Sequence, residues 1–155
     1  MTSESHDRLN QTTIAALQEL IEINLDSYNG FTKAANLIED TALQHHFSEV
    51  AQERIRQAVG LQQLITSDDE QPLIEGSIAG RIHRAIMDWK DTFSDGPSAV
   101  LTEVKRGEDY IKAKYEAVLT KTTGRNVADV LRRQYATVKQ ARDHICELRT
   151  KFSAS

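Results

Sequence analysis

The sequence predicts an all-α protein: a four-helix bundle of long amphipathic helices with an extra, shorter crossover helix. The 155 residues include only 7 Gly and 2 Pro, so few turns or breaks are available. Charged residues make up 27% of the chain, and most of them are helix formers. Apolar residues also recur at alternating steps of three and four, which is the spacing of one helix face. These three observations leave little room for a sheet.

The first predicted helix follows a polar lead-in. Residues 1–11 have no periodicity and are expected to be flexible, whereas residues 12–155 have the length of one domain. From Thr12 an apolar series continues to Ile38 and predicts a long helix. Thr41 with Gln44 forms a capping box that opens the second helix almost at once. So short a link implies an antiparallel pair.

The second helix carries an apolar series from Leu43 to Ile65, which ends at the polar run 67–72. Ser77 is a plausible cap for a shorter third helix, which continues to Phe93. Residues 94–97, Ser-Asp-Gly-Pro, end that helix.

The last two helices repeat the same spacing. Pro97 suits the first turn of the fourth helix, and Gly124 is expected to close it. Asn126 with Asp129 starts the fifth helix, whose apolar series continues to Phe152. Four long helices and one shorter one can cover their apolar faces only as a bundle.

The links between the helices suggest how the bundle is connected. Short turns at 39–41 and 122–125 imply two helical hairpins, and residues 68–96 bridge them. A bridge of this size can run the length of the bundle, as in the long-crossover connection of ferritin-like bundles. A simple up-and-down arrangement remains the alternative.

Each long helix interrupts its apolar series with one polar side chain. These are Asn24, Arg54, Glu108 and Gln134. In the crossover topology, a rise of 1.5 Å per residue places these four residues within roughly 10 Å of one another along the bundle axis. A buried Arg needs a partner, and Glu108 is the one opposite charge on these faces. We therefore predict an ion pair between Arg54 and Glu108, with Asn24 and Gln134 completing its hydrogen bonds.

These interrupting residues have two interpretations. A buried polar group can fix helix register at some cost in stability. Alternatively, inward side chains at mid-height can form a pocket for a ligand or a metal. One or two of the four side chains could also reach solvent. Tyr28 and Tyr115 lie on the same faces and are expected to add hydroxyl partners or to fill the core.

A di-iron carboxylate site is not expected. Such a bundle needs Glu on two helices and Glu-x-x-His on the other two, but no Glu here has His three residues later. Glu53 and Arg56 come nearest in spacing, and helical phase turns them away from the core. His83 is expected to cap or pack, and it is a secondary candidate for a site. The sequence predicts that the protein binds no cofactor. The alternative is a bound Fe or Mn ion.

Other histidines and the single cysteine give no catalytic centre. His45 with Glu49 is expected to form a solvated pair on the second helix. His144 and Cys146 are two residues apart, which points them in nearly opposite directions on a helix, so they cannot act as a nucleophile pair. The sequence also has no phosphate-binding loop or nucleophile elbow. It therefore favours a protein that is not an enzyme.

Charge and composition exclude several partners. The net charge of −4 offers no basic stripe for nucleic acid. Since the chain lacks a run of about 20 apolar residues, no membrane span is expected, and we predict a soluble, cytoplasmic protein. Apolar residues beside the first helix's main face, Ile23, Leu25 and Leu37, suggest a homo-oligomer such as a dimer.

Three stretches carry a family resemblance. They are LIEINLDSYNGFTKAA at 20–35, GSIAGRIHRAIMDWK at 76–90 and RGEDYIKAKYEAVL at 106–119. They resemble a bacterial family of ferritin-like four-helix-bundle proteins of unknown function, over roughly residues 10–150. The most specific parts are His83 with Arg84, and Gly107-Glu108-Asp109 followed by Tyr115. Ile86 departs from the family pattern, which often has a large aromatic residue there.

The resemblance implies a ferritin-like fold without an established activity, and it makes Glu108 the natural relic of a carboxylate ligand. Two hypotheses follow. The first is a non-enzymatic binding, structural or stress-linked protein with a buried polar layer in place of a di-iron site. The second is a ferritin-like protein that still binds Fe or Mn through a degenerate carboxylate site.

Overall fold

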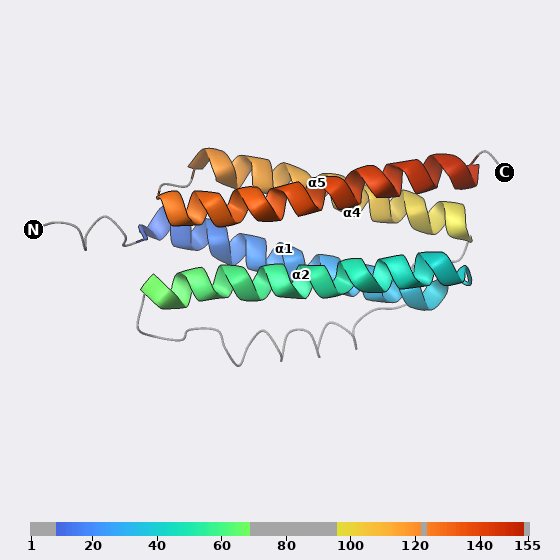
Figure 1. The fold of residues 1–155 in the computed structure, drawn as a ribbon, viewed down its shortest axis with the longest axis horizontal. Coiled ribbons are helices and arrows are strands. Elements are labelled where there is room, and N and C mark those ends of the chain that lie inside the picture. The colour runs from blue at the N-terminus through green and yellow to red at the C-terminus, as the bar shows by residue number, and fades with distance from the viewer. Residues whose placement is uncertain (1–8, 69–95, 122–123, 154–155) are drawn as a thin grey trace, which may run out of the picture.

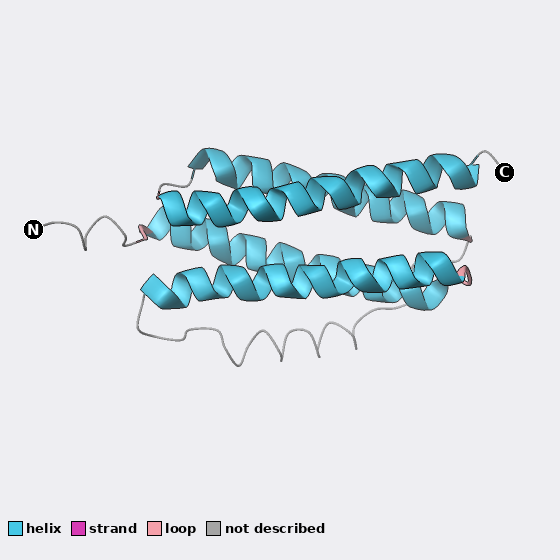
Figure 2. Cartoon of the chain, viewed as in Figure 1, coloured by secondary structure: helices cyan, strands magenta, loops and turns pink. Residues whose placement is uncertain are grey.

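The computed structural model describes residues 9–68, 96–121 and 124–153, and these form four α-helices without a strand (Figure 2). Their bounds are Gln11–Leu37 for α1, Thr41–Asp68 for α2, Pro97–Lys121 for α4 and Arg125–Ser153 for α5. The all-helical prediction is confirmed for this part of the chain. The helix predicted at 77–93, with His83, lies outside the described residues.

The starts of α1 and α2 follow the capping rules, and the predicted start of α2 needs a correction. Asn10 caps α1, because its Oδ1 accepts a hydrogen bond from the Thr13 backbone N–H at 2.7 Å. Asp40 caps α2 in the same way and accepts from the Leu43 N–H at 2.9 Å. The capping box predicted at Thr41 is therefore wrong by one residue. The Asp40 carboxylate is the better cap, since its negative charge faces the positive end of the helix dipole.

A proline marks the start of α4 and a glycine marks the start of α5. Pro97 is the first residue of α4, as predicted, where its missing N–H costs no hydrogen bond. Gly124 has φ +105°, a left-handed conformation that favours glycine. Its carbonyl accepts from the Ala128 N–H at 3.1 Å, so Gly124 takes the cap position of α5 and the start predicted at Asn126 is wrong, since α5 begins at Arg125.

The four helices pack so that every neighbour is antiparallel (Figure 1). Helix α1 lies against α2 and α4, and α5 lies against the same two helices from the other side. Helices α1 and α5 run in one direction, whereas α2 and α4 run in the other. The end of α2 and the start of α4 are thus at opposite ends of the bundle. These helix directions match the long-crossover alternative of the prediction.

The apolar core is divided into two clusters. One cluster joins the start of α1 and α5 to the end of α2 and α4, and it includes Leu17, Leu61, Tyr115 and Leu131. The other joins the opposite ends of the same helices and includes Phe31, Phe47, Leu101 and Ile145. Polar side chains lie on all four helices between these clusters. The division therefore defines a polar level at mid-height.

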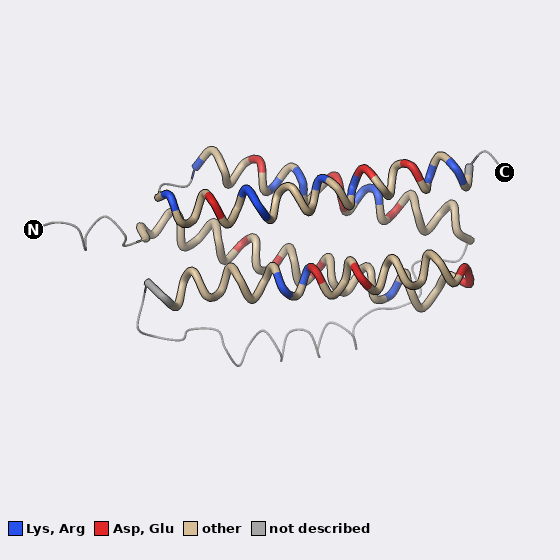
Figure 3. The backbone as a smooth tube through the Cα atoms, in the orientation of Figure 1, with Lys and Arg blue, Asp and Glu red and all other residues tan. Residues whose placement is uncertain are grey.

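Charged residues of both signs alternate along the helices, most densely along α4 and α5 (Figure 3). Several are paired along one helix, as Lys105 is with Asp109 at 2.7 Å and Lys112 with Glu116 at 2.8 Å. Pairs at i,i+4 are typical of solvated helix faces. None of the helices described is long and apolar enough to cross a membrane.

Candidate functional site

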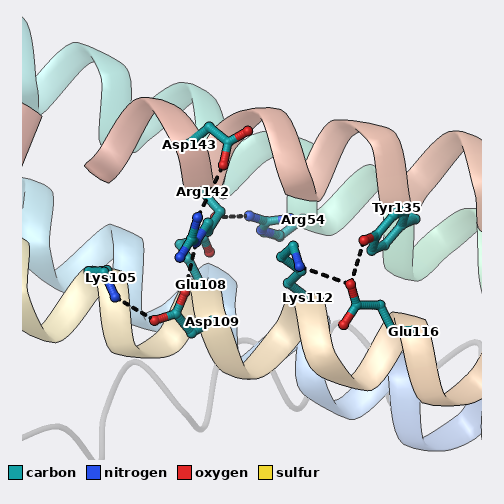
Figure 4. Close-up of polar contacts among 9 residues, drawn as sticks. All are labelled: Arg54, Lys105, Glu108, Asp109, Lys112, Glu116, Tyr135, Arg142 and Asp143. Carbon is teal, nitrogen blue, oxygen red and sulfur yellow. Dashed lines mark hydrogen bonds and ion pairs between the residues drawn. The ribbon is translucent and has the colours of Figure 1, made fainter. Parts of the chain in front are cut away.

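The centre of the polar level is the Arg54 side chain on α2, which is completely buried. Its Nη2 donates a hydrogen bond to Oε2 of Glu108 on α4 at 2.5 Å (Figure 4). Glu108 is 1% exposed. Two further donors are used, since Nε binds Ser27 Oγ at 3.1 Å and Nη1 binds Gln57 Oε1 at 3.3 Å. The pair joins α2 to α4, which are diagonal to each other in the bundle.

An aromatic ring covers the same guanidinium group. The Arg54 Cζ lies 5.9 Å from the centroid of the Phe31 ring. At this distance the negative face of the ring attracts the cation. Arg54 is thus held by a charge, two neutral acceptors and a ring, which compensates for the loss of its water shell.

Two glutamines extend the hydrogen bonding from Arg54 to α5. Gln57 Nε2 donates to the backbone O of Gln134 at 3.4 Å, and Gln134 Nε2 donates to the backbone O of Gln57 at 3.2 Å. Gly60 lies beside them, since a Cβ there would be 3.2 Å from Gln134 Nε2. Both glutamines line a groove of about 510 Å³ between α2 and α5, so Gln134 is only half-buried.

Tyr115 on α4 completes the connection to α1. Its hydroxyl donates to Gln134 Oε1 at 2.7 Å and accepts from Asn24 Nδ2 at 2.8 Å. Asn24 also donates to the Leu20 carbonyl at 2.8 Å. We call the connected set the polar layer; its members are Asn24, Ser27, Arg54, Gln57, Glu108, Tyr115 and Gln134. It links all four helices through hydrogen bonds.

Burial shifts the pKa values of both acidic groups in the polar layer. Loss of solvation raises the pKa of Glu108 to about 7, although the positive charge of Arg54 opposes the rise. Burial also raises the pKa of Tyr115, against the opposing effects of the Asn24 hydrogen bond and the Arg54 charge. Tyr115 therefore keeps its proton and remains a donor at neutral pH.

The partners of the ion pair differ in part from those expected. Arg54 and Glu108 are together, but Asn24 and Gln134 do not complete their hydrogen bonds, because both reach Tyr115 instead. Ser27 and Gln57 fill that role. Each lies three residues after an expected member of the same helix, and the i,i+3 rule could have identified them.

Of the two other predicted residues, Tyr28 lies outside the polar layer and His83 falls outside the described residues. Tyr28 is half-buried and packs against the core cluster of Phe31 and Phe47, which is the core-filling alternative of the prediction. His83 belongs to a segment that the structure does not describe, so its part in a site stays a prediction.

The residues of the polar layer do not fit a di-iron site. Glu108 is its one carboxylate, and Arg54 already binds it. Glu53 and Arg56 form an ion pair of 2.9 Å with each other on the outer surface, as helical phase predicted. Within the described ranges, no group of three or more His, Cys, Asp or Glu side chains could hold a metal ion.

These observations define an all-helical bundle whose helices are tied together by a buried polar layer. The chain belongs to the family described as domain of unknown function DUF2383, whose family model matches residues 12–121. The match includes α1, α2 and α4, and with them Asn24, Arg54 and Glu108, whereas Gln134 on α5 lies beyond it. No curated protein matches the chain.

Proposed function

We propose that the protein is a ferritin-like bundle in which the polar layer replaces a di-iron site, and that it is a non-enzymatic protein acting through association. The crossover direction of the helices supports the ferritin-like part of this proposal (Figure 1). The ion pair between Arg54 and Glu108 is the observation that supports the replacement of a di-iron site.

Electrostatic repulsion opposes a metal ion at the centre of the bundle. Arg54 places a permanent positive charge 2.5 Å from the only carboxylate of the polar layer. A divalent cation at Glu108 would have to displace that guanidinium, and the displaced Arg54 would then be buried beside a second cation. The remaining members offer amide, hydroxyl and phenol groups, which are weak substitutes for the carboxylates of an iron site.

A register-fixing role accounts for the arrangement better. Sliding α2 against α4 by one turn would separate Arg54 from Glu108 and leave two buried charges without partners. Misplacing α5 would leave the hydrogen bonds of Gln134 with the Tyr115 hydroxyl and the Gln57 carbonyl unmade. The polar layer therefore favours one arrangement of the four helices over other arrangements that a purely apolar core would also allow. Single polar residues have this effect in coiled coils.

The second candidate is an Fe or Mn protein with a degenerate carboxylate site. The buried Glu108 favours it, because a carboxylate with a raised pKa inside a bundle is an unusual structural group. Calorimetric titration of the purified protein with Fe²⁺ and Mn²⁺ separates the two candidates. The proposal predicts that Glu108→Gln does not change the binding of Fe²⁺ or Mn²⁺. Tight binding by the wild type that is lost in Glu108→Gln would favour the metal protein.

If the interior is structural, binding partners have to use the outer surface. We expect self-association, although Ile23 and Leu25 do not supply the interface suggested by the sequence. Both are buried in the apolar cluster that contains Leu17 and Leu61. Of the three residues only Leu37 is exposed. Light scattering measures the mass in solution directly: a dimer or larger assembly supports association with copies of the chain, and a monomer restricts association to other partners.

A further inference from the structure

Two histidines that are distant in the sequence meet between α2 and α5. The ring centroids of His46 and His144 are 4.5 Å apart, and the rings are nearly perpendicular, at 74°. Metal-bound imidazoles that occupy neighbouring coordination positions also have their rings close together, because each nitrogen is only about 2 Å from the ion. The approach of the two rings is therefore compatible with a shared ligand.

One nitrogen of this pair has no hydrogen-bond partner. His46 is half-buried, and its Nε2 is buried without a hydrogen-bond partner. Buried imidazole nitrogens are usually satisfied, so this atom calls for an explanation. Burial, assisted by the charge of His144 and opposed by Glu49, lowers the pKa of His46.

The surroundings of the two rings are polar and open to solvent. His46 and His144 line a groove of about 460 Å³ together with Gln140, Asp143 and Glu147. The carboxylate Oε2 of Glu147 lies 3.9 Å from Nδ1 of His144, since the i,i+3 spacing places both on one face of α5. The groove thus supplies negative charge beside the imidazoles and access for an ion from water.

We propose that His46 and His144 bind one divalent transition-metal ion of the class that prefers imidazole, such as Cu²⁺, Ni²⁺ or Zn²⁺. The two imidazoles are the protein ligands, water fills the other positions, and Glu147 adds negative charge beside His144. The bound ion joins α2 to α5 and stabilises the folded bundle. This site is separate from the polar layer and does not depend on the function proposed for it.

Cu²⁺ is the probe for the first test, because imidazole sites bind it most strongly in this series. We expect one equivalent to bind the wild type and to show nitrogen coupling in its electron paramagnetic resonance spectrum. His46→Ala and His144→Ala should each weaken binding at least tenfold. His45→Ala is the matched control, since His45 is the adjacent residue but is 75% exposed and paired with Glu49 at 3.0 Å. It should change the affinity less than twofold.

Thermal unfolding with and without Cu²⁺ gives a second measurement. The ion should raise the Tm of the wild type and of His45→Ala, and leave that of His144→Ala unchanged. His144 is half-exposed, so its removal should leave the helical circular dichroism signal intact. Equal Cu²⁺ binding by all four proteins, loss of binding only in His45→Ala, or a wild type that binds no Cu²⁺ would each overturn the proposal.

Discussion

Arg54 Nη2 and Glu108 Oε2 meet at 2.5 Å across the diagonal of the bundle, in a place where neither side chain is more than 1% exposed. The two charges come from helices that are not neighbours. Their contact therefore passes through the middle of the core, between its two apolar clusters. Each charge depends on the other, because water cannot replace a missing partner.

Removing one of the two charges should destabilise the protein more than removing both. We expect Arg54→Met or Glu108→Leu alone to lower the free energy of unfolding by about 3–5 kcal/mol, because the other charge stays buried and unpaired. The double variant should be as stable as the wild type, or more stable by about 1–4 kcal/mol. Urea unfolding of the four proteins measures this. If the losses in the double variant simply add, the two residues act independently and the account of the pair is wrong.

Glu108 should make stability depend on pH in the direction opposite to that of a carboxylate whose pKa is lowered on folding. Its pKa rises from an ordinary 4.5 to about 7 on folding, so the folded state binds the proton more tightly. The stability that it contributes is fully present below about pH 4.5 and is lost as the pH rises to about 7. The free energy of unfolding of the wild type, minus that of the Arg54→Met/Glu108→Leu double variant, should therefore fall over this range.

The subtraction removes the effect of groups common to both proteins, such as His46. Unfolding in urea at several pH values between about 4 and 8 supplies the curves. Parallel curves for the wild type and the double variant would show that Glu108 does not titrate differently in the folded and unfolded states.

Tyr115→Phe tests the part of the polar layer that connects α1, α4 and α5. The variant removes a donor to Gln134 and an acceptor for Asn24, and both amides are left without that partner. We expect a loss of about 1–3 kcal/mol in the free energy of unfolding. The control is Tyr135→Phe, whose hydroxyl binds Glu116 at the surface (Figure 4) and should cost less than about 1 kcal/mol. Equal costs would argue against a special role for Tyr115.

Two glycines inside helices should respond differently to alanine. Gly107 on α4 has open space where a Cβ would lie, so Gly107→Ala should stabilise the protein by about 0.5–1 kcal/mol through helix propensity. At Gly60 the new Cβ would lie 3.2 Å from Gln134 Nε2 and would push that amide from the Gln57 carbonyl. Gly60→Ala should therefore gain less, or lose stability. Thermal unfolding compares them, and an equal gain would show that the Gln134 contact is unimportant.

Most of the fold follows from patterns visible in the sequence. The three-four spacing of apolar residues predicts α1, α2, α4 and α5, since one face of each helix has to be buried. The end residues are harder to predict, because several polar residues near a helix start can cap it. At α2 both Asp40 and Thr41 are suitable, and the charged residue takes the position.

The site was predictable only in part. Arg54 and Glu108 had to find each other, because buried opposite charges on the core faces have no cheaper solution. Their neutral partners could not be assigned, since amides, hydroxyls and phenols on four helices can pair in many ways at similar cost. The contact of His46 with His144 depends on the relative rotation of α2 and α5, which no local pattern specifies.

In the proposed function, Arg54 occupies the place that a metal ion would take beside Glu108. Crystals soaked in Fe²⁺ or Mn²⁺, with data collected at the metal absorption edge, test this most directly. We predict that the Arg54 guanidinium remains on Glu108, with no anomalous density at coordination distance from that carboxylate. An anomalous peak bound to Glu108, with Arg54 displaced, would contradict it.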